Sequence, residues 1–469
     1  MVFSNSVFLF LFLPISLIVY YLPFIKNIQI KNIWLLLVSL VFYAWGEPIY
    51  IFLMVLSIIV NYFLGRWVEK HAKSKKGKCI VALACVYNLG QLFFFKYLGW
   101  IVGLIFKTNV PDSPIFHLAL PIGISFYTFQ ALSYVIDVYR GKDKAQSNIL
   151  NVGLYIAFFP QLIAGPIVRY GSIAEQLLHR DHTSEKFADG TWRFTIGLTK
   201  KLFLANQLSV VAEIAFSCDP SKRSVVLAWV GALCFMLQIY FDFSGYSDMA
   251  IGLGKMFGFE FMENFNYPYI SKSVTEYWRR WHISLGEWFR DYLLYPLSFG
   301  PAVRMKKKLN KKIGRKAANI IISTMTVFVV WLATGIWHGA NLTFLVWGLL
   351  QFICITVETY RKPMKNKKLA AVLGFSLTFV FILLTKVIFN SPSMTDAIHY
   401  YGTMLALEGN PLNDAYGMYW IKNYIWFIII GLIFIFPVVE NITKRIQATG
   451  KKTLIASTGI IKMIFMTLL

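Results

Sequence analysis

Long apolar runs, separated by short polar stretches, follow one another along almost the whole chain. The hydrocarbon core of a bilayer is about 30 Å thick, so a helix needs roughly 20 apolar residues to cross it. Runs that approach or exceed this length lie at residues 7–24, 32–46, 48–65, 79–106, 116–139, 150–168, 191–217, 224–257, 318–337, 341–359, 369–389, 423–441 and 454–469. The pattern predicts an all-α, polytopic integral membrane helical bundle with about ten to thirteen spans.

The composition supports this interpretation. Of the 469 residues, 57% are hydrophobic and only 15% are charged, which excludes an ordinary soluble protein of this length. The first apolar run has Pro14 in its middle and no small-residue cleavage site, so we expect a retained first helix rather than a cleaved signal peptide. The five cysteines lie in or beside apolar runs without CxxC spacing, which argues against a disulfide framework and against a zinc site.

The net charge of +23 is concentrated in short basic clusters that adjoin apolar runs. Nucleic-acid binding could explain such clusters, but the positive-inside rule explains them with fewer assumptions. The clusters occupy residues 66–78, 140–144, 304–316, 361–368 and 443–452. We expect them in the cytoplasm, with residues 390–422 outside, and we expect no nucleic-acid partner.

The alternation of spans and basic loops becomes ambiguous between residues 145 and 303. Polar residues, Gly and Pro interrupt the apolar runs there, notably at 158–177 and 239–278. Irregular backbone at membrane depth is tolerated only where protein buries it or water reaches it. We therefore expect re-entrant or interfacial helices around a cavity in the middle third of the chain.

Inside this stretch, the segment WRRWHISLGEWFRDYLLYPL at residues 278–297 alternates charged and aromatic residues around one histidine, His282. Plotted at 100° per residue, residues 278–293 predict one amphipathic helix that lies in the interface or packs flat on the bundle. Its apolar side carries Trp278, Trp281, Leu285, Trp288, Phe289, Tyr292 and Leu293, and its polar side carries Arg279, Arg280, Glu287, Arg290 and Asp291. His282 falls within the apolar arc, so we expect it to be buried and neutral.

A second histidine, His338, lies deep in the apolar segment VVWLATGIWHGANLTFLVWG. Gly335 and Gly339 flank it and would let another backbone or a substrate approach closely. A single histidine on an apolar face is more often a satisfied core residue than a functional one. Two of them in Trp-rich segments next to helix-breaking sequence favour a functional site instead. The other histidines, His71, His117, His179, His182 and His399, lie in polar loops or near loop ends.

Other candidates have weaker signals. Asp242 and Ser244, with Asp248 nearby, lie inside a hydrophobic run, where carboxylates are costly without partners. A structural polar network explains them slightly better than a binding role does. Arg279 and Arg280 could hold phosphates or merely anchor the interface, and the sequence does not decide between these readings. Trp337 and Asn341, on either side of His338, complete the candidate substrate-binding residues, namely Trp337, Asn341, Arg279, Arg280, Asp242 and Ser244.

Several motifs together resemble the membrane-bound O-acyltransferase superfamily, in the branch that contains the membrane subunit of alginate O-acetyltransferase. They are NLGQLFFFKY, LPIGISFYTFQALSYVIDVYRG, FFPQLIAGPIVRY, YFDFSGYSDMAIGLGKMFGF, NFNYPYISKSVTEYWRRWHISLGEWFRDYLLYPL and GIWHGANLTFLVWG, in the same order as in that branch. The resemblance covers nearly the whole chain, although beyond about residue 390 it is mostly hydropathy. We interpret residues 1–469 as one domain, with a motif-rich catalytic part at about 115–350 and C-terminal helices at about 369–469.

The resemblance implies a central funnel or tunnel with two catalytic residues, His338 and His282. His338 would act as the base, and His282 would orient the acyl carbonyl or stabilise developing charge. No tightly bound cofactor is implied. The acyl donor would be acetyl-CoA or a carrier-bound thioester on the cytoplasmic side of a bacterial plasma membrane. The acceptor would be an extracytoplasmic polysaccharide or cell-wall polymer, reached through a separate extracytoplasmic acetyltransferase partner.

Two alternatives remain open at this stage. One is D-alanyl transfer to teichoic acid, which other members of these polymer-modifying branches perform. The other is a proton-coupled transporter or flippase of polymer precursors, with His282, Asp242 and Asp248 as a proton relay. The absence of a clear internal repeat argues against the transporter.

Overall fold

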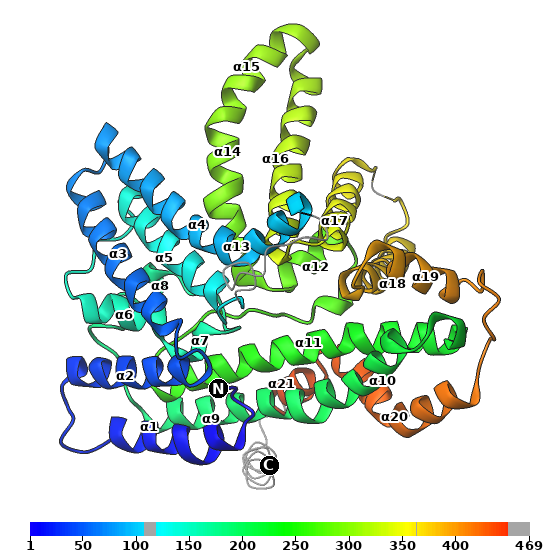
Figure 1. The fold of residues 1–469 in the computed structure, drawn as a ribbon, viewed down its shortest axis with the longest axis horizontal. Helices are drawn as coiled ribbons and strands as arrows, with labels where there is room; N and C mark the ends of the chain where they lie inside the picture. The colour runs from blue at the N-terminus through cyan, green and yellow to red at the C-terminus, as the bar shows by residue number, and fades with distance from the viewer. Residues whose placement is uncertain (107–118, 363, 449–469) are drawn as a thin grey trace. The chain divides into compact units, whose positions relative to one another are not determined.

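The computed structural model describes residues 1–106, 119–362 and 364–448. These residues form helices joined by loops and contain no β-strand (Figure 1). Eight of the helices are long and apolar enough to cross a membrane. They are α2 (Ile28–Gly46), α3 (Ile51–Lys70), α4 (Lys75–Phe106), α11 (Val225–Met256), α16 (Arg315–His338), α17 (Leu342–Tyr360), α18 (Lys367–Asn390) and α20 (Ala415–Phe434). The all-α, polytopic class predicted from the sequence is confirmed.

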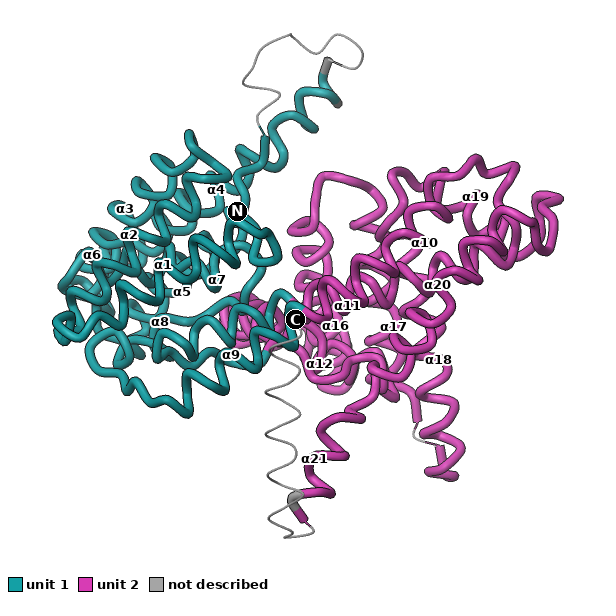
Figure 2. Tube along the Cα trace, turned by 90° about the horizontal axis from the view of Figure 1, so that it is seen from below, with its two compact units in different colours: residues 1–198, 246–263 teal, residues 199–245, 264–469 magenta. Residues whose placement is uncertain are grey.

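The chain divides into two compact units, coloured separately in Figure 2. Unit 1 comprises residues 1–198 and 246–263, and unit 2 comprises residues 199–245 and 264–469. Each unit is therefore built from two separate stretches of chain. Helix α11 begins in unit 2 and ends in unit 1, because the division falls between Gly245 and Tyr246.

Unit 1 packs its long helices around an aromatic core. Helix α5 contacts both α3 and α4, and α6 contacts α2 and α3. The rings of Phe3, Phe8, Phe42 and Phe159 lie within about 6.3 Å of one another in this core. The remaining helices of the unit are the π-helix η1 (Phe8–Phe12), α1 (Leu13–Tyr20), α5 (Ile124–Arg140), α6 (Ile149–Ala157), α7 (Phe159–Leu162), α8 (Tyr170–Ile173) and α9 (Ser184–Thr199).

Unit 2 contains all the helices of the candidate site. Its shorter helices before α16 are η3 (Lys200–Ala205), α10 (Asn206–Ser217), η4 (Pro220–Lys222), η5 (Pro268–Ile270), α12 (Val274–Arg280), α13 (Ile283–Phe289), η6 (Arg290–Leu294), α14 (Tyr295–Phe299) and α15 (Pro301–Ile313). After α18 come α19 (Met394–Met404) and α21 (Val438–Ala448). Helix α10 packs on α20, and α16 packs closely on α17. A β-carbon at Gly348 would lie only 2.8 Å from the carbonyl oxygen of Trp331, so this helix pair requires glycine there.

The eight long helices are fewer than the ten to thirteen spans expected, and the middle of the chain accounts for part of the difference. The run at 150–168 is divided at Phe158 into the short helices α6 and α7, with Pro160 in the first turn of α7. The run at 191–217 is divided among α9, the π-helix η3 and α10. The first run forms an apolar helix of Phe8–Tyr20 only, and the run at 454–469 lies outside the described residues.

Candidate active site

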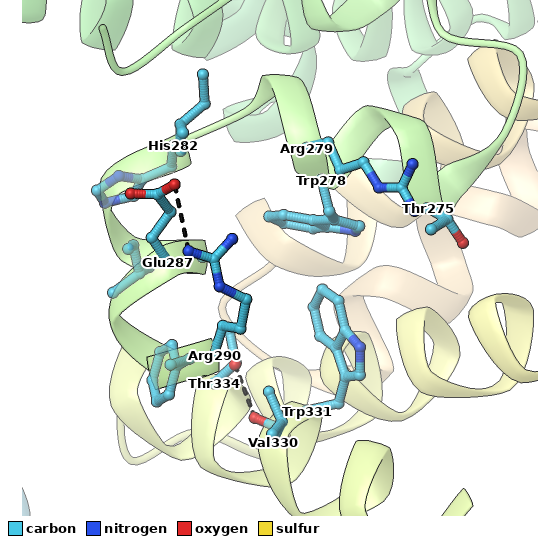
Figure 3. A pocket seen from close by; sticks show the side chains of 13 residues that line it. Thr275, Trp278, Arg279, His282, Glu287, Arg290, Val330, Trp331 and Thr334 are labelled. Atoms are coloured by element: carbon cyan, nitrogen blue, oxygen red, sulfur yellow. Dashed lines mark hydrogen bonds and ion pairs between the residues drawn. The ribbon is translucent and has the colours of Figure 1, made fainter. Parts of the chain in front are cut away.

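A cavity of about 440 Å³ opens in unit 2, bounded by α12, α13, the π-helix η6 and α16 (Figure 3). This volume falls within the range of small-molecule sites. Its lining combines aromatic rings, one histidine and three charged side chains, namely Trp278, Trp331, His282, Arg279, Glu287 and Arg290, with smaller side chains between them. The rings of Trp278 and Trp331 contact edge to face, with centroids 4.9 Å apart, and join α12 to α16. The predicted cavity in the middle third of the chain therefore has a counterpart here.

The predicted single helix over residues 278–293 is wrong, because the helix breaks at His282. Helix α12 ends at Arg280, Trp281 is extended, and His282 adopts a left-handed backbone with φ of 45° and ψ of 54°. Helix α13 then starts at Ile283. A non-glycine residue at positive φ is uncommon and costs about 1–3 kcal/mol, so other contacts must hold this turn.

The contacts that hold it come from Asn264, which lies 18 positions earlier in the chain and is fully buried. The backbone N–H of Ile283 donates to the carbonyl oxygen of Asn264 at 2.9 Å. The side-chain oxygen of Asn264 accepts from the backbone N–H of Ser284 at 3.2 Å and from the Ser284 hydroxyl at 2.9 Å. Two residues after Asn264, the backbone N–H of Asn266 donates to the carbonyl oxygen of Arg280 at 2.9 Å. These bonds offset the cost of the left-handed turn.

The imidazole of His282 is 4% exposed, as the apolar arc predicted. Its Nδ1 lies 3.1 Å from the side-chain oxygen of Asn264, and its ring packs edge to face on Phe243 with centroids 4.7 Å apart. Burial lowers the pKa of His282 to about 3, because desolvation disfavours the imidazolium. The side chain is therefore neutral at physiological pH.

His338 is the last residue of α16 and is half-buried in an aromatic box. Its ring centroid lies 4.7 Å from that of Trp337 and 5.0 Å from those of Trp347 and Phe389. Gly335 admits the next helix, since a β-carbon there would lie 2.8 Å from the carbonyl oxygen of Phe344. A β-carbon at Gly339 would lie 2.9 Å from the ring of Phe344, so the close packing expected around the flanking glycines is seen at both.

The two histidines meet through Trp337. The Trp337 ring contacts His282 at a centroid distance of 6.3 Å and His338 at 4.7 Å. Residues 56 positions apart in sequence, on α16 and at the α12–α13 junction, are therefore brought to one tryptophan. The sequence singled out both histidines and Trp337 but did not predict that this ring would join them.

Arg279 and Arg280, for which phosphate binding and anchoring at the interface were both open, have different surroundings. Arg279 is exposed and lines the cavity, and no carboxylate among the described residues forms an ion pair with it. Arg280 pairs with Glu276 at 2.9 Å and donates to the carbonyl oxygen of Asn266 at 3.1 Å. Arg280 therefore stabilises the turn, whereas Arg279 lines the cavity.

Of the predicted site residues, only His282 and Arg279 line the cavity, whereas His338, Trp337, Arg280 and the remaining candidates do not. Asn341 caps α17, since its side chain accepts from the N–H of Thr343 at 3.1 Å and donates to the carbonyl oxygen of Pro392 at 2.7 Å. Asp242 pairs with Lys201 at 2.7 Å, and Ser244 is buried. The ion pair of Asp242 is a structural contact of the kind that the sequence slightly favoured for it.

In the transporter alternative, Asp248 forms a proton relay with His282 and Asp242. Asp248 belongs to unit 1. It pairs there with Arg193, with a shortest distance of 2.6 Å between the charged atoms. Both carboxylates of the relay are thus held in ion pairs, as in a structural network. The described residues contain no group of three or more His, Cys, Asp or Glu side chains that could hold a metal ion.

Two residues of this region, Lys386 and Asn264, were not among the candidates predicted from the sequence. Lys386 interrupts the apolar run at 369–389, and an isolated lysine in such a run is itself a signal of function that could have been used. It is 4% exposed, and its ammonium nitrogen lies 4.6 Å from the ring centre of Trp281. Asn264 gave no comparable signal, because its importance depends on contacts with residues far along the chain.

Comparison with known proteins identifies the family to which the chain is similar. Residues 142–390 match the membrane-bound O-acyltransferase family. The chain is 39% identical over 412 residues to a probable alginate O-acetylase, AlgI, of Pseudomonas aeruginosa, covering 87% of this chain and 75% of that protein. It is 31% identical over 444 residues to a peptidoglycan O-acetyltransferase of Helicobacter pylori, covering 87% and 80%. A teichoic acid D-alanyltransferase of Bacillus subtilis is 28% identical over 287 residues, covering 58% and 69%.

Proposed function

Because the chain belongs to the membrane-bound O-acyltransferase family, we propose that it passes an acetyl group from a cytoplasmic thioester across the membrane for O-acylation of an extracytoplasmic polymer. The chain is a multi-pass membrane O-acyltransferase. The observation that carries the proposal is the pair of histidines on one tryptophan, beside a cavity of about 440 Å³. The membrane is the cytoplasmic membrane of a bacterium, as the bacterial sources of the relatives suggest.

Acyl transfer to a hydroxyl needs a base and a means of holding the reacting carbonyl. His338 takes the proton from the attacking hydroxyl, while the hydroxyl oxygen forms a bond to the thioester carbon. The carbon–sulfur bond then breaks, and the leaving thiolate receives this proton from His338. The aromatic rings packed around His338 reduce the access of water, which would compete with the hydroxyl and hydrolyse the thioester.

The donor enters the cavity with its phosphates toward Arg279. Acetyl-CoA and a carrier-bound phosphopantetheine thioester both carry phosphate, and a guanidinium binds phosphate with two parallel hydrogen bonds. Arg279 suits this role because it lines the cavity without a carboxylate partner among the described residues. Trp278 and Trp331 then lie against the apolar part of the donor's arm.

The acceptor is a hydroxyl of a polysaccharide or cell-wall polymer. The relatives are named for alginate and for peptidoglycan, which both present hydroxyl groups outside the cytoplasmic membrane. A separate extracytoplasmic acetyltransferase completes delivery to the polymer. D-alanyl transfer to teichoic acid is the second candidate, since the similarity to a D-alanyltransferase covers 58% of the chain.

The experiment uses the purified chain in lipid vesicles with a radiolabelled acetyl thioester. We expect release of free thiol by the chain. With the separate extracytoplasmic acetyltransferase added, we expect movement of label onto a hydroxyl acceptor, such as an alginate oligosaccharide or a peptidoglycan fragment. Turnover of a D-alanyl carrier thioester, but not of an acetyl thioester, would transfer the proposal to the second candidate. Gradient-driven uptake of a polymer precursor without thioester consumption would instead identify a transporter.

A further inference from the structure

The side-chain amide of Asn264 has only one orientation that suits its neighbours. The backbone N–H of Ser284 points at one of its atoms at 3.2 Å, and the Ser284 hydroxyl donates to the same atom at 2.9 Å. A backbone N–H can only donate, so this atom is the amide oxygen rather than the NH₂ group. The reversed orientation would set two donors against each other in a buried site.

The orientation of Asn264 determines which nitrogen of His282 carries the proton. Nδ1 lies 3.1 Å from the same amide oxygen, which can accept a hydrogen bond but cannot donate one. Nδ1 must therefore carry the proton for this bond to form. In a neutral imidazole only one nitrogen is protonated, so Nε2 has the lone pair.

We propose, on the basis of the acyl transfer proposed above, that Asn264 is a positioning residue. It holds the Nδ1–H tautomer of His282, so that Nε2 accepts a hydrogen bond from the substrate. The group that Nε2 accepts from is an N–H or O–H, such as an amide of the donor's pantetheine arm or the attacking hydroxyl. In this form Nε2 of His282 accepts a hydrogen bond and does not donate one to the oxyanion.

The buried state of the ring supports this role. The low pKa of His282 makes Nε2 a weak base that stays unprotonated, and a neutral acceptor is what orienting an N–H or O–H requires. The left-handed backbone at His282 fits the same purpose. It is held by the backbone of Asn264 through Ile283, so one residue fixes both the position and the tautomer of the ring.

The charged and titratable groups around the ring come from several helices. They are Arg279, Glu287 and Arg290 in the same cavity, Lys386 above Trp281, Asp242 next to Phe243 in the chain, and His338 beyond Trp337. All of them remain in place when Asn264 is changed. A difference between the wild type and an Asn264 variant in the pH at which His282 is protonated therefore reports the side chain that replaces Asn264.

The first experiment reads the tautomer directly. Nitrogen-15 spectra of the full chain in lipid, labelled at histidine, distinguish Nδ1–H from Nε2–H, and the His282→Asn variant identifies the signal of His282. We expect an Nδ1–H imidazole that is neutral at pH 7. An Nε2–H signal would overturn the inference. This result does not depend on acyl transfer, so it remains informative if the wild type consumes no thioester and the proposed function fails.

The second experiment uses Asn264→Asp, which keeps an acceptor in the same place and preserves the bonds to Ser284. A carboxylate next to Nδ1 stabilises the imidazolium, so the pKa of His282 rises and Nε2 is protonated at higher pH. We expect the pKa of His282, followed in the same nitrogen-15 spectra as the pH is lowered, to rise by roughly one to three pH units. An unmoved His282 titration in this variant would contradict the inference.

A matched control is Ser284→Ala, which removes one donor to the Asn264 oxygen and leaves the bond to Nδ1 intact. We expect His282 to keep the wild-type tautomer and to be protonated at the same pH as in the wild type. Asn264→Leu removes the acceptor and should give a mixture of tautomers with a lower kcat. If this variant does not accumulate, Asn264→Asp still decides the question.

Discussion

The ammonium nitrogen of Lys386 lies 4.6 Å from the ring centre of Trp281, the residue that precedes His282. It also lies 4.9 Å from the ring centre of Phe389, and that ring packs against His338. One buried lysine thus contacts the aromatic surroundings of both histidines. No carboxylate among the described residues pairs with it.

We predict that Lys386→Met raises thermal stability. Burying a cation without a paired carboxylate costs several kcal/mol, whereas a desolvated cation–π contact returns about 2 kcal/mol. Methionine has a similar length and fills the same space without the charge. Thermal unfolding in detergent would measure the change, with Lys386→Arg as the charged control. A lower Tm for the methionine variant would show that the cation–π contacts outweigh the cost of burial.

His338→Ala should reduce acyl transfer by roughly 100-fold or more, because general base catalysis contributes on this scale. The Tm should change little, since the ring is only half-buried. The thioester assay measures the activity, and His399→Ala is the matched control. His399 is half exposed and pairs with Glu408 at 2.7 Å, away from the cavity. A variant of His338 that retains most of the activity would refute its assignment as the base.

Substitutions of the two neighbouring arginines, Arg279 and Arg280, should have different effects, one on donor binding and the other on thermal stability. Arg279→Ala should raise the KM for the thioester donor roughly ten-fold, since hydrogen bonds to charged groups contribute about 1.5–3 kcal/mol. Arg280→Ala should instead lower the Tm modestly, because it removes the ion pair with Glu276 and the bond to the Asn266 carbonyl. Steady-state kinetics and thermal unfolding of both variants test the division. An unchanged KM for Arg279→Ala would exclude a phosphate contact.

Stability should fall in acid, partly through His282. Its pKa is about 3 in the folded chain and about 6.5 in an unfolded one, so between these values the unfolded chain binds the extra proton. The free energy of unfolding therefore falls as the pH drops below about 6.5, by at most about 1.4 kcal/mol per pH unit, and is unaffected above it.

Thermal unfolding between pH 7.5 and 4.5 measures this dependence, and His282→Asn should flatten it. The slope should not vanish, because burial also lowers the pKa of His182 in unit 1 to about 4. An identical slope in wild type and variant would mean that His282 is protonated in the folded chain.

The basic clusters at 66–78, 304–316, 361–368 and 443–452 should be cytoplasmic, and residues 390–422 external. Single cysteines at Lys307 and at Leu407, both exposed, would be placed in a chain whose five native cysteines are replaced. A membrane-impermeant maleimide should label intact cells at residue 407 and not at residue 307. Labelling at residue 307 would reverse the orientation.

The features that were predictable from the sequence are those that depend on local pattern. Apolar runs identified the long helices, because a span must bury about 20 consecutive residues whatever its neighbours are. The apolar arc identified the burial of His282, which the helix break did not alter. Arg279 and Arg280 could not be told apart, because both fell on the polar side of the helix that was assumed to be continuous.

The break itself could not be predicted from residues 278–293 alone. Every residue around His282 is compatible with a helix, and the left-handed turn is imposed by hydrogen bonds from the segment at Asn264. Likewise, the meeting of His282 and His338 on Trp337 depends on the packing of α16 against the α12–α13 junction. Such tertiary contacts override the local preference for a helix.

The separation of α10 and α20 along the chain has a consequence for biosynthesis. Helix α10 ends at Ser217, but its packing partner α20 begins about 200 residues later. At 5–20 residues per second, the ribosome needs roughly 10–40 s to reach it. During this interval the surface that α10 later packs against α20 is covered only by lipid or by an insertion chaperone. Nascent chains arrested before Ala415 should therefore be degraded more readily than the completed protein.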